Sequence, residues 1–220
     1  MDIRLYGAVP DSIVDGPGLR YGVFVQGCTH HCPGCHNPES HPAEGGTLTA
    51  IDAVLADIRA NGLVHDVTFS GGEPFEQAAA CAELAQRLKA EGYGIWSYTG
   101  YLYEDLLRTA RSAGPDAGNA KPAGNAASPA GAADDASAGD ASAAVPATRL
   151  DPAGVRDLLA CVDVLVDGPF VESLKSLSLK WCGSSNQRLI DLAAMRAAGD
   201  LDRVILWEPP SFVPEKPPSW

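Results

Sequence analysis

The residues with the clearest chemical potential are three cysteines in the segment GCTHHCPGCHNP. Cys28, Cys32 and Cys35 have the spacing C-x3-C-x2-C, so three of the six cysteines in the chain fall within eight residues. Thiolates are soft ligands that suit zinc, copper(I) and iron–sulfur clusters. Pro33 and Gly34 favour a loop over a helix, because proline restricts φ and glycine permits unusual backbone angles. The spacing therefore predicts a metal site held by a loop.

Two kinds of metal centre fit these thiols. One is zinc with three cysteines and one histidine, since His30, His31 and His36 stand close by in the sequence. The other is a [4Fe–4S] cluster, which usually has four cysteine ligands. This loop holds only three, so one iron would stay open for a ligand from outside the chain. An open coordination position is typical of a metal centre that does chemistry, but spacing alone leaves both alternatives open.

Length and composition restrict the class of protein. The chain has 220 residues, a net charge of −12 and 45% hydrophobic residues, which is typical of a globular protein of roughly one domain. The acidic balance argues against a protein that grips nucleic-acid phosphates. No apolar stretch is long enough for a membrane span, and the N-terminus lacks the apolar core of a signal peptide. We therefore expect a cytoplasmic protein without a membrane or nucleic-acid partner.

Strand and helix patterns alternate along the ordered part of the chain, which predicts an α/β fold with a mainly parallel sheet. The expected strands are 21–26, 65–70, 94–98 and 162–166, with a weaker pattern at 203–207. The expected helices are 51–58 (behind a Thr49-x-x-Asp52 capping signal), 81–88, 103–111 and 151–160. Ligands in such folds bind at the carboxyl ends of the strands. The loops there read GCTHHCPGC, GGEP, YTGY and DGPF, which predicts one shared site.

One segment differs sharply in composition from the rest. Residues 112–148 consist almost entirely of Ala, Gly, Ser, Pro, Asn and Asp, with one large apolar residue, Val145. Such a segment has too little to bury to offset its ordering entropy. We expect a disordered insertion within a single domain formed by 1–111 and 149–207, followed by a proline-rich tail, 208–220.

Six motifs in a fixed order carry a resemblance to a known family. They are DGPGLR (15–20), GCTHHCPGCHNP (27–38), FSGGEP (69–74), YTGY (98–101), VDGPF (166–170) and GSSNQR (183–188). The cysteine triad followed by GGE resembles the radical S-adenosylmethionine (SAM) superfamily. The full set resembles, within it, the family of activating proteins of anaerobic ribonucleoside-triphosphate reductase. The resemblance covers about 1–111 and 151–190.

The resemblance implies a fold and a cofactor pair. The fold would be a partial (β/α) barrel of about five to six strands with the cluster at its open end. Cys28, Cys32 and Cys35 would each bind one iron of a [4Fe–4S] cluster, and SAM would chelate the fourth. Reduction of the cluster would cleave SAM into methionine and a 5′-deoxyadenosyl radical. That radical would take a hydrogen atom from a glycine of the reductase, so the enzyme would be an oxidoreductase that generates a glycyl radical.

The resemblance also assigns positions to SAM. It places SAM beside Gly34, Cys35 and His36, and it places the SAM amino group near Gly72. The absence of a Cβ at Gly72 fits a backbone that approaches a ligand closely. Glu73 either accepts from the amino group or only caps the following helix. No side chain is expected to act as a catalytic acid, base or nucleophile, because the cofactors carry the chemistry.

Partners follow from the same resemblance. The protein substrate would be anaerobic ribonucleoside-triphosphate reductase, and the electron donor a low-potential protein such as a flavodoxin. Two alternatives remain open. In the first, the same radical chemistry acts on another target, either a different glycyl-radical enzyme, such as a formate-lyase type, or a small molecule. In the second, the protein is a non-enzymatic Cys3His zinc module.

The remaining cysteines and one histidine have simpler expectations. Cys81 and Cys161 fall on apolar patterns and are predicted to be core thiols. Cys182 stands where the resembling family would have arginine, and a tolerated small substitute is the simplest interpretation. His41 follows the cysteine loop and is expected to be solvated.

Overall fold

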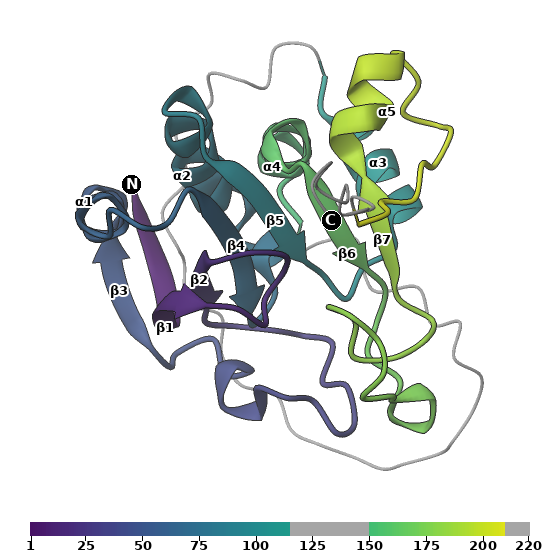
Figure 1. Cartoon of the computed structure of the whole chain (residues 1–220), viewed down its shortest axis with the longest axis horizontal. Coiled ribbons are helices and arrows are strands. Elements are labelled where there is room, and N and C mark those ends of the chain that lie inside the picture. Colours follow the sequence, from purple (N-terminus) through teal and green to yellow (C-terminus); the bar gives the residue numbers. More distant parts are fainter. Residues whose placement is uncertain (115–149, 210–220) are drawn as a thin grey trace, which may run out of the picture.

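The structure is a computed structural model that describes residues 1–114 and 150–209. One mixed sheet has the strand order β3-β1-β2-β4-β5-β6-β7 (Figure 1). The strands are β1 (Asp2–Ser12), β2 (Arg20–Val25), β3 (Thr47–Ala50), β4 (Asp66–Gly71), β5 (Gly94–Tyr98), β6 (Val164–Asp167) and β7 (Arg188–Asp191). The helices are α1 (Ile51–Ala60), α2 (Ala78–Ala90), α3 (Tyr103–Ser112), α4 (Pro152–Cys161) and α5 (Leu192–Ala198).

The central strands run parallel, so their carboxyl ends lie at one edge of the sheet. β2 pairs with β4, β4 with β5, and β5 with β6, all in parallel register. β1 pairs antiparallel with β2 and β3, and β7 pairs antiparallel with β6. The crossover helices must pack on the sheet to join parallel neighbours. This arrangement places the loops that follow β2, β4, β5 and β6 side by side.

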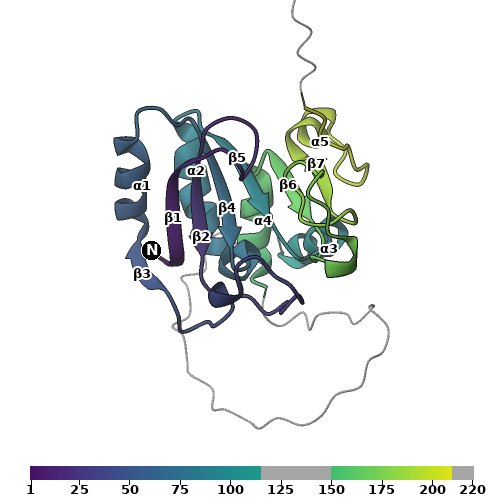
Figure 2. The same ribbon diagram turned by 60° about the horizontal axis from the view of Figure 1, so that its bottom comes forward.

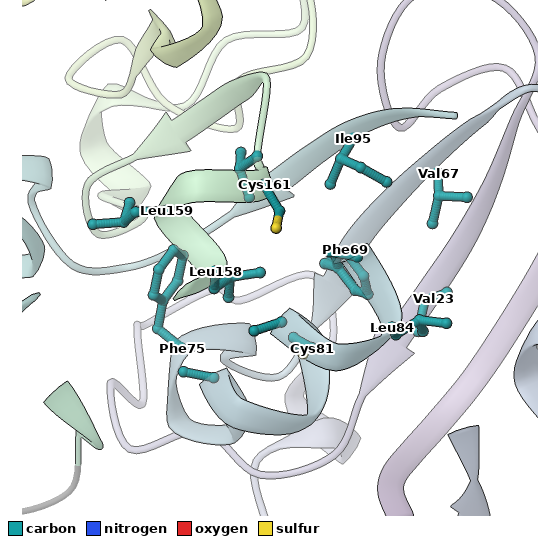
Figure 3. Packing of buried hydrophobic residues seen from close by; sticks show 14 of the residues in the cluster. Val23, Val67, Phe69, Phe75, Cys81, Leu84, Ile95, Leu158, Leu159 and Cys161 are labelled. Atoms are coloured by element: carbon teal, nitrogen blue, oxygen red, sulfur yellow. The ribbon is translucent and has the colours of Figure 1, made fainter. Parts of the chain in front are cut away.

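The main core lies between the sheet and the helices. Side chains of β2, β4 and β5 meet side chains of α2 and α4, which lie next to each other on one face of the sheet (Figures 2 and 3). The labelled residues in Figure 3 include Val23, Val67, Phe69, Ile95, Cys81, Leu84, Leu158, Leu159 and Cys161. Full burial of one large aliphatic side chain contributes about 1.5–3 kcal/mol. Cys81 and Cys161 are buried here, as predicted.

A second, aromatic cluster packs on strands β5 and β6. Trp96, Trp181 and Trp207 meet edge to face, with ring centroids 5.1–5.8 Å apart. The guanidinium of Arg20 lies 5.2 Å from the Trp96 ring centroid, and its Nε donates to Thr68 Oγ1 at 2.7 Å. This cluster supports β5 and β6 on the side opposite to the main core.

The structure corrects part of the expected fold. All four strong strands and all four helices are present, but β1, β3, β7 and α5 were missed. The strand number of five to six was therefore wrong, and a partial barrel is not confirmed: the described residues form one seven-stranded sheet with β3 and β7 at its ends. The 203–207 pattern yields only an isolated bridge between Ile190 and Leu206. The capping signal was also wrong, because Ala50 occupies the N-cap of α1 without a side-chain bond.

The missed strands have physical reasons. β1 contains Gly7 and Pro10, is mostly exposed and carries register shifts, so it lacks a clear two-residue alternation. β3 and β7 have four residues each, with few apolar positions. The predicted insertion and tail lie almost wholly outside the described residues. Within the described ranges, no helix combines the length and apolarity needed to cross a membrane.

Candidate metal centre

The four predicted loops meet around one cavity of about 120 Å³. All three cysteines of the triad line it, together with Gly72 of the GGEP loop. The other lining residues are His30, His41, Ser70, Gly71, Glu73, Tyr98, Thr99, Gly100, Gly168, Phe170 and Gln187. The parallel strands β2, β4, β5 and β6 bring these loops together, because their carboxyl ends share one edge of the sheet.

The cysteine loop begins where β2 ends and has no regular helix across the triad. The Cys28 backbone N–H donates to the His41 carbonyl at 3.0 Å, which closes the loop on itself. The Cys35 N–H donates to the Cys32 carbonyl at 3.1 Å, so the last two cysteines sit on one tight turn. Gly34 within that turn has φ of +71°, a left-handed conformation that favours glycine.

The thiols of the triad fit a soft metal centre. Burial raises the pKa of Cys28 to about 12, and burial also raises the pKa of Cys32. Thiols in this state hold their protons at neutral pH until a metal replaces them. The Cys35 sulfur already accepts a hydrogen bond from the Asn37 N–H at 3.4 Å.

The geometry of the donor groups bears on which metal they suit. Within the described ranges, no three or more His, Cys, Asp or Glu side chains converge on a point that could hold one ion. A single zinc requires all its sulfur ligands at about 2.3 Å. In a cubane, by contrast, each cysteine binds a different iron. The three thiols line one cavity and are soft donors of the type that an iron–sulfur cluster requires.

Glu73 ties three of the four loops together. Its carboxylate is 1% exposed, and both oxygens are occupied by protein donors. Oε1 accepts from Phe75 N at 3.0 Å and Thr99 Oγ1 at 2.9 Å. Oε2 accepts from Gly100 N at 2.8 Å and lies 2.9 Å from His30 Nε2. Of the two interpretations of Glu73, the capping role is therefore seen directly, and it extends to the neighbouring loops.

His30 connects the cysteine loop to this carboxylate. Burial by itself lowers the pKa of His30, but the hydrogen bond and negative charge of Glu73 outweigh burial, and the pKa of His30 is raised. The His30 ring packs edge-on against Tyr101, with centroids 4.5 Å apart. The ring between Cys28 and Cys32 is thus fixed by one polar and one aromatic contact.

The two glycines of GGEP are required by protein packing. A Cβ at Gly72 would lie 2.3 Å from the Gly27 carbonyl oxygen, and one at Gly71 would lie 2.8 Å from the backbone of Phe24. Gly72 N–H donates to Val25 O at 2.8 Å, which binds the GGEP loop to the end of β2. The close approach of Gly27 thus explains why residue 72 is a glycine, without a ligand.

The residues predicted to contact SAM fall in different places. A neighbouring cavity of about 480 Å³ is lined by His36, Cys35 and Cys182, among others. Cys35 therefore borders both cavities, whereas Gly72 borders only the smaller one and Gly34 lines neither. A Cβ at Gly34 would meet the Glu172 side chain at 2.8 Å. Burial raises the pKa of Cys182 to about 11.

Comparison with known proteins shows which family the sequence matches. The family described as "4Fe-4S single cluster domain" matches residues 14–114 and 143–190, which include the whole triad. The anaerobic ribonucleoside-triphosphate reductase-activating protein of Escherichia coli (strain K12) is 31% identical over 186 residues, covering 81% of this chain and 92% of that protein. The proteins of the same name from Salmonella typhi and Enterobacteria phage T4 are 30% and 27% identical, over 84% of this chain and 96% and 90% of theirs.

The chain belongs to the family of anaerobic ribonucleoside-triphosphate reductase-activating proteins. The resemblance inferred from the six motifs is therefore confirmed. Among solved structures, QueE from Escherichia coli aligns with 45% of this chain and 52% of that chain at 16% identity, with a TM-score of 0.38. That likeness is too slight to bear on the fold of this activating protein.

Sequence reasoning missed several residues of the site in this activating protein. Phe170 and Gln187 line both cavities, although only the motifs that contain them were noticed. Gln187 fastens its loop, since its amide accepts from Gly183 N at 2.8 Å and donates to Gly168 O at 2.9 Å. His41, which was expected to be solvated, is half-buried, and its Nε2 is buried. No local sequence signal marks the contact of Gln187 with Gly168, because these two residues are 19 positions apart in the chain.

Proposed function

We propose that this protein is a radical SAM activase of anaerobic ribonucleoside-triphosphate reductase and that it works in the cytoplasm. The observation that carries the proposal is the cysteine triad. Cys28, Cys32 and Cys35 line one cavity inside the region that matches a 4Fe-4S cluster domain. Among the described residues they are the only cysteines that line it, so a cluster held there would keep one iron for an outside ligand.

When bound, a reduced [4Fe–4S] cluster would supply the electron that cleaves SAM into methionine and a 5′-deoxyadenosyl radical, which takes hydrogen from a glycine of the reductase. The protein's own residues hold and shield this chemistry. Cys28, Cys32 and Cys35 would hold the cluster on the loop that His30 and Glu73 fix. The lining residues, most of them half-buried, would limit the access of water to reactive species.

SAM would extend from this site toward the larger cavity. The two cavities are adjacent, because both are lined by Cys35, Ser70, Tyr98, Phe170 and Gln187. Within them, Cys35, His36 and Gly72 are our candidates for SAM contacts, while Gly34 would act through the turn that orients Cys35. The protein partner would be the reductase named in the relatives, and the electron donor a low-potential protein such as a flavodoxin.

The test is anaerobic reconstitution of the wild-type chain and two cysteine variants. The wild type should bind about four irons per chain and, once reduced, convert SAM to 5′-deoxyadenosine. Cys32→Ala should lose both properties. Cys161→Ala is the matched control, because Cys161 lies in the main core and lines neither cavity.

The partner is tested in the same preparation. Mixing with the reductase should produce a glycyl radical doublet in electron paramagnetic resonance, and mixing with a formate-lyase type enzyme should not. One tightly bound zinc per chain, or wild-type turnover in Cys32→Ala, would overturn the proposed function.

A further inference from the structure

His41 carries a buried polar atom without a partner. Its Nε2 is one of two buried side-chain nitrogen or oxygen atoms in the described ranges that make no hydrogen bond; the other is Oε1 of Gln26. Buried polar groups in proteins nearly always have a partner, and each exception requires an explanation. A histidine ring nitrogen that faces solvent can form a hydrogen bond with water. The burial of the His41 Nε2 without a protein partner therefore points to a bound group as its partner.

The position of His41 narrows the identity of that ligand. His41 lines the same cavity of about 120 Å³ as Cys28, Cys32 and Cys35. Its carbonyl accepts from the Cys28 N–H at 3.0 Å, which places the residue beside the first cysteine of the triad. Its ring packs edge-on against His31, with centroids 5.2 Å apart, so the side chain is held in place. The cavity thus brings His41 together with three cysteines whose sulfur atoms can accept a hydrogen bond.

The chemistry of the ring and of sulfur is complementary. A neutral imidazole carries one N–H, which donates, and a protein thiolate or cluster sulfide accepts. Hydrogen bonds to the sulfurs are among the features that set the reduction potential of an iron–sulfur cluster. Such a bond stabilises the more negative, reduced cluster more than the oxidised cluster.

We propose that His41 donates its Nε2–H to a sulfur of the cluster or of its cysteine ligands and raises the cluster's reduction potential. This inference rests on the proposed cluster, and it assigns His41 a tuning role without making it a ligand. His30 differs from His41, because the His30 Nε2 is engaged by Glu73 at 2.9 Å, whereas the His41 Nε2 has no partner among the described residues.

The test uses His41→Phe, which keeps a planar ring against His31 and removes the N–H. His65→Phe is the matched control, since His65 is exposed and lines neither cavity. The clusters are reconstituted anaerobically, iron is counted, and the midpoint potential is measured by spectroscopic redox titration without SAM. We expect full iron in all three proteins and a more negative potential only in His41→Phe. At a fixed potential the ratio of reduced to oxidised cluster should fall about tenfold, which equals about 59 mV for a one-electron couple.

Two further measurements keep the inference testable if His41→Phe folds poorly. His41→Gln retains an N–H donor and should restore a potential close to that of the wild type. In wild-type protein labelled with 15N-histidine, pulsed electron paramagnetic resonance of the reduced cluster should show a weak histidine nitrogen coupling. An unchanged potential in His41→Phe, or no such coupling, overturns the inference.

Failure of this inference differs from failure of the proposed function. Loss of about one iron per chain in both His41→Phe and His41→Gln, but not in His65→Phe, would make His41 a ligand and overturn the tuning role. No cluster in the wild type would instead overturn the proposed function itself.

Discussion

Two buried carboxylates organise the two halves of the sheet's carboxyl edge in different ways. Glu73 follows β4 and is 1% exposed, whereas Asp167 ends β6 and is 0% exposed. Glu73 collects donors from the GGEP loop, the loop after β5 and the cysteine loop. Asp167 instead binds Arg188 of β7 and the Tyr103 N–H at the start of α3.

The two carboxylates therefore have different roles, one at the cysteine cavity and one at the edge of the sheet. Glu73 connects loops that line the cysteine cavity, and its partners are backbone N–H groups, a hydroxyl and an imidazole. Asp167 connects a strand to a helix, and its charge is neutralised by the guanidinium of Arg188. The same guanidinium also donates hydrogen bonds to Glu104. A buried charge requires such partners. The first carboxylate therefore holds functional loops in place, and the second holds the edge of the sheet.

Replacing Glu73 should produce the largest effect. In Glu73→Gln, a single carbonyl oxygen replaces two carboxylate oxygens, so at least two of the four donors lose their acceptor. Loss of a buried charged partner costs about 3 kcal/mol. We expect that loss in urea unfolding of the metal-free protein, together with a large fall in the iron retained after reconstitution. Wild-type iron content in Glu73→Gln would show that Glu73 does not hold the cysteine loop.

Replacing Asp167 should separate stability from iron binding. In Asp167→Asn, Arg188 keeps its bond to Glu104, so the loss should be smaller, about 2 kcal/mol. Iron per folded chain should remain close to that of the wild type, because Asp167 does not line the cysteine cavity. The comparison between the two halves fails if iron binding falls as far in Asp167→Asn as in Glu73→Gln.

The sequence predicted the central strands and the loops that follow them better than it predicted the contacts of Glu73 and Asp167. The four central strands and the loops after them follow from apolar runs and turn residues, and the cysteine spacing marks the metal loop. Edge strands β3 and β7 were missed because four residues with few apolar positions carry little pattern. Sheet pairing with distant strands determines these segments, and local propensity does not.

The roles within the site were harder to predict than its location. Glu73 and His30 are 43 residues apart, so nothing in the sequence indicates their contact. Gly72 was interpreted through a ligand, but the close approach of Gly27 explains it. His41 was interpreted as solvated, but its environment depends on how the loop folds back onto Cys28. The motifs identified residues that lie together at the site, but the contacts of each residue depend on tertiary packing, which the motifs do not indicate.

The glycine beside each carboxylate offers a finer comparison. An alanine Cβ at Gly72 would lie 2.3 Å from backbone, whereas at Gly168 the nearest atom is 3.7 Å away. Gly168 has φ of +99°, so alanine there is strained but has room. We expect Gly72→Ala to cost about 2 kcal/mol and Gly168→Ala about 1 kcal/mol in chemical unfolding. Gly62→Ala, with open space and no positive φ, is the matched control and should be nearly neutral. Equal losses at Gly72 and Gly168 would mean that backbone crowding does not set the position of the GGEP loop.

The smallest expected effect lies at the outer partner of the Asp167 half. The hydrogen bond from Arg188 lowers the pKa of Glu104, whose side chain is 50% exposed. Because the folded-state pKa is depressed, the stabilisation is present above the unfolded value of about 4.3 and is lost as pH falls through the folded value. Solvent screening limits it to about 0.5 kcal/mol. The difference in unfolding free energy between wild type and Glu104→Gln should therefore be small at pH 6, decrease as the pH falls below the unfolded value, and shrink in 1 M salt. A difference that stays constant from pH 6 to pH 3 would show that Glu104 supports the edge of the sheet through packing and that only Asp167 pairs electrostatically with Arg188.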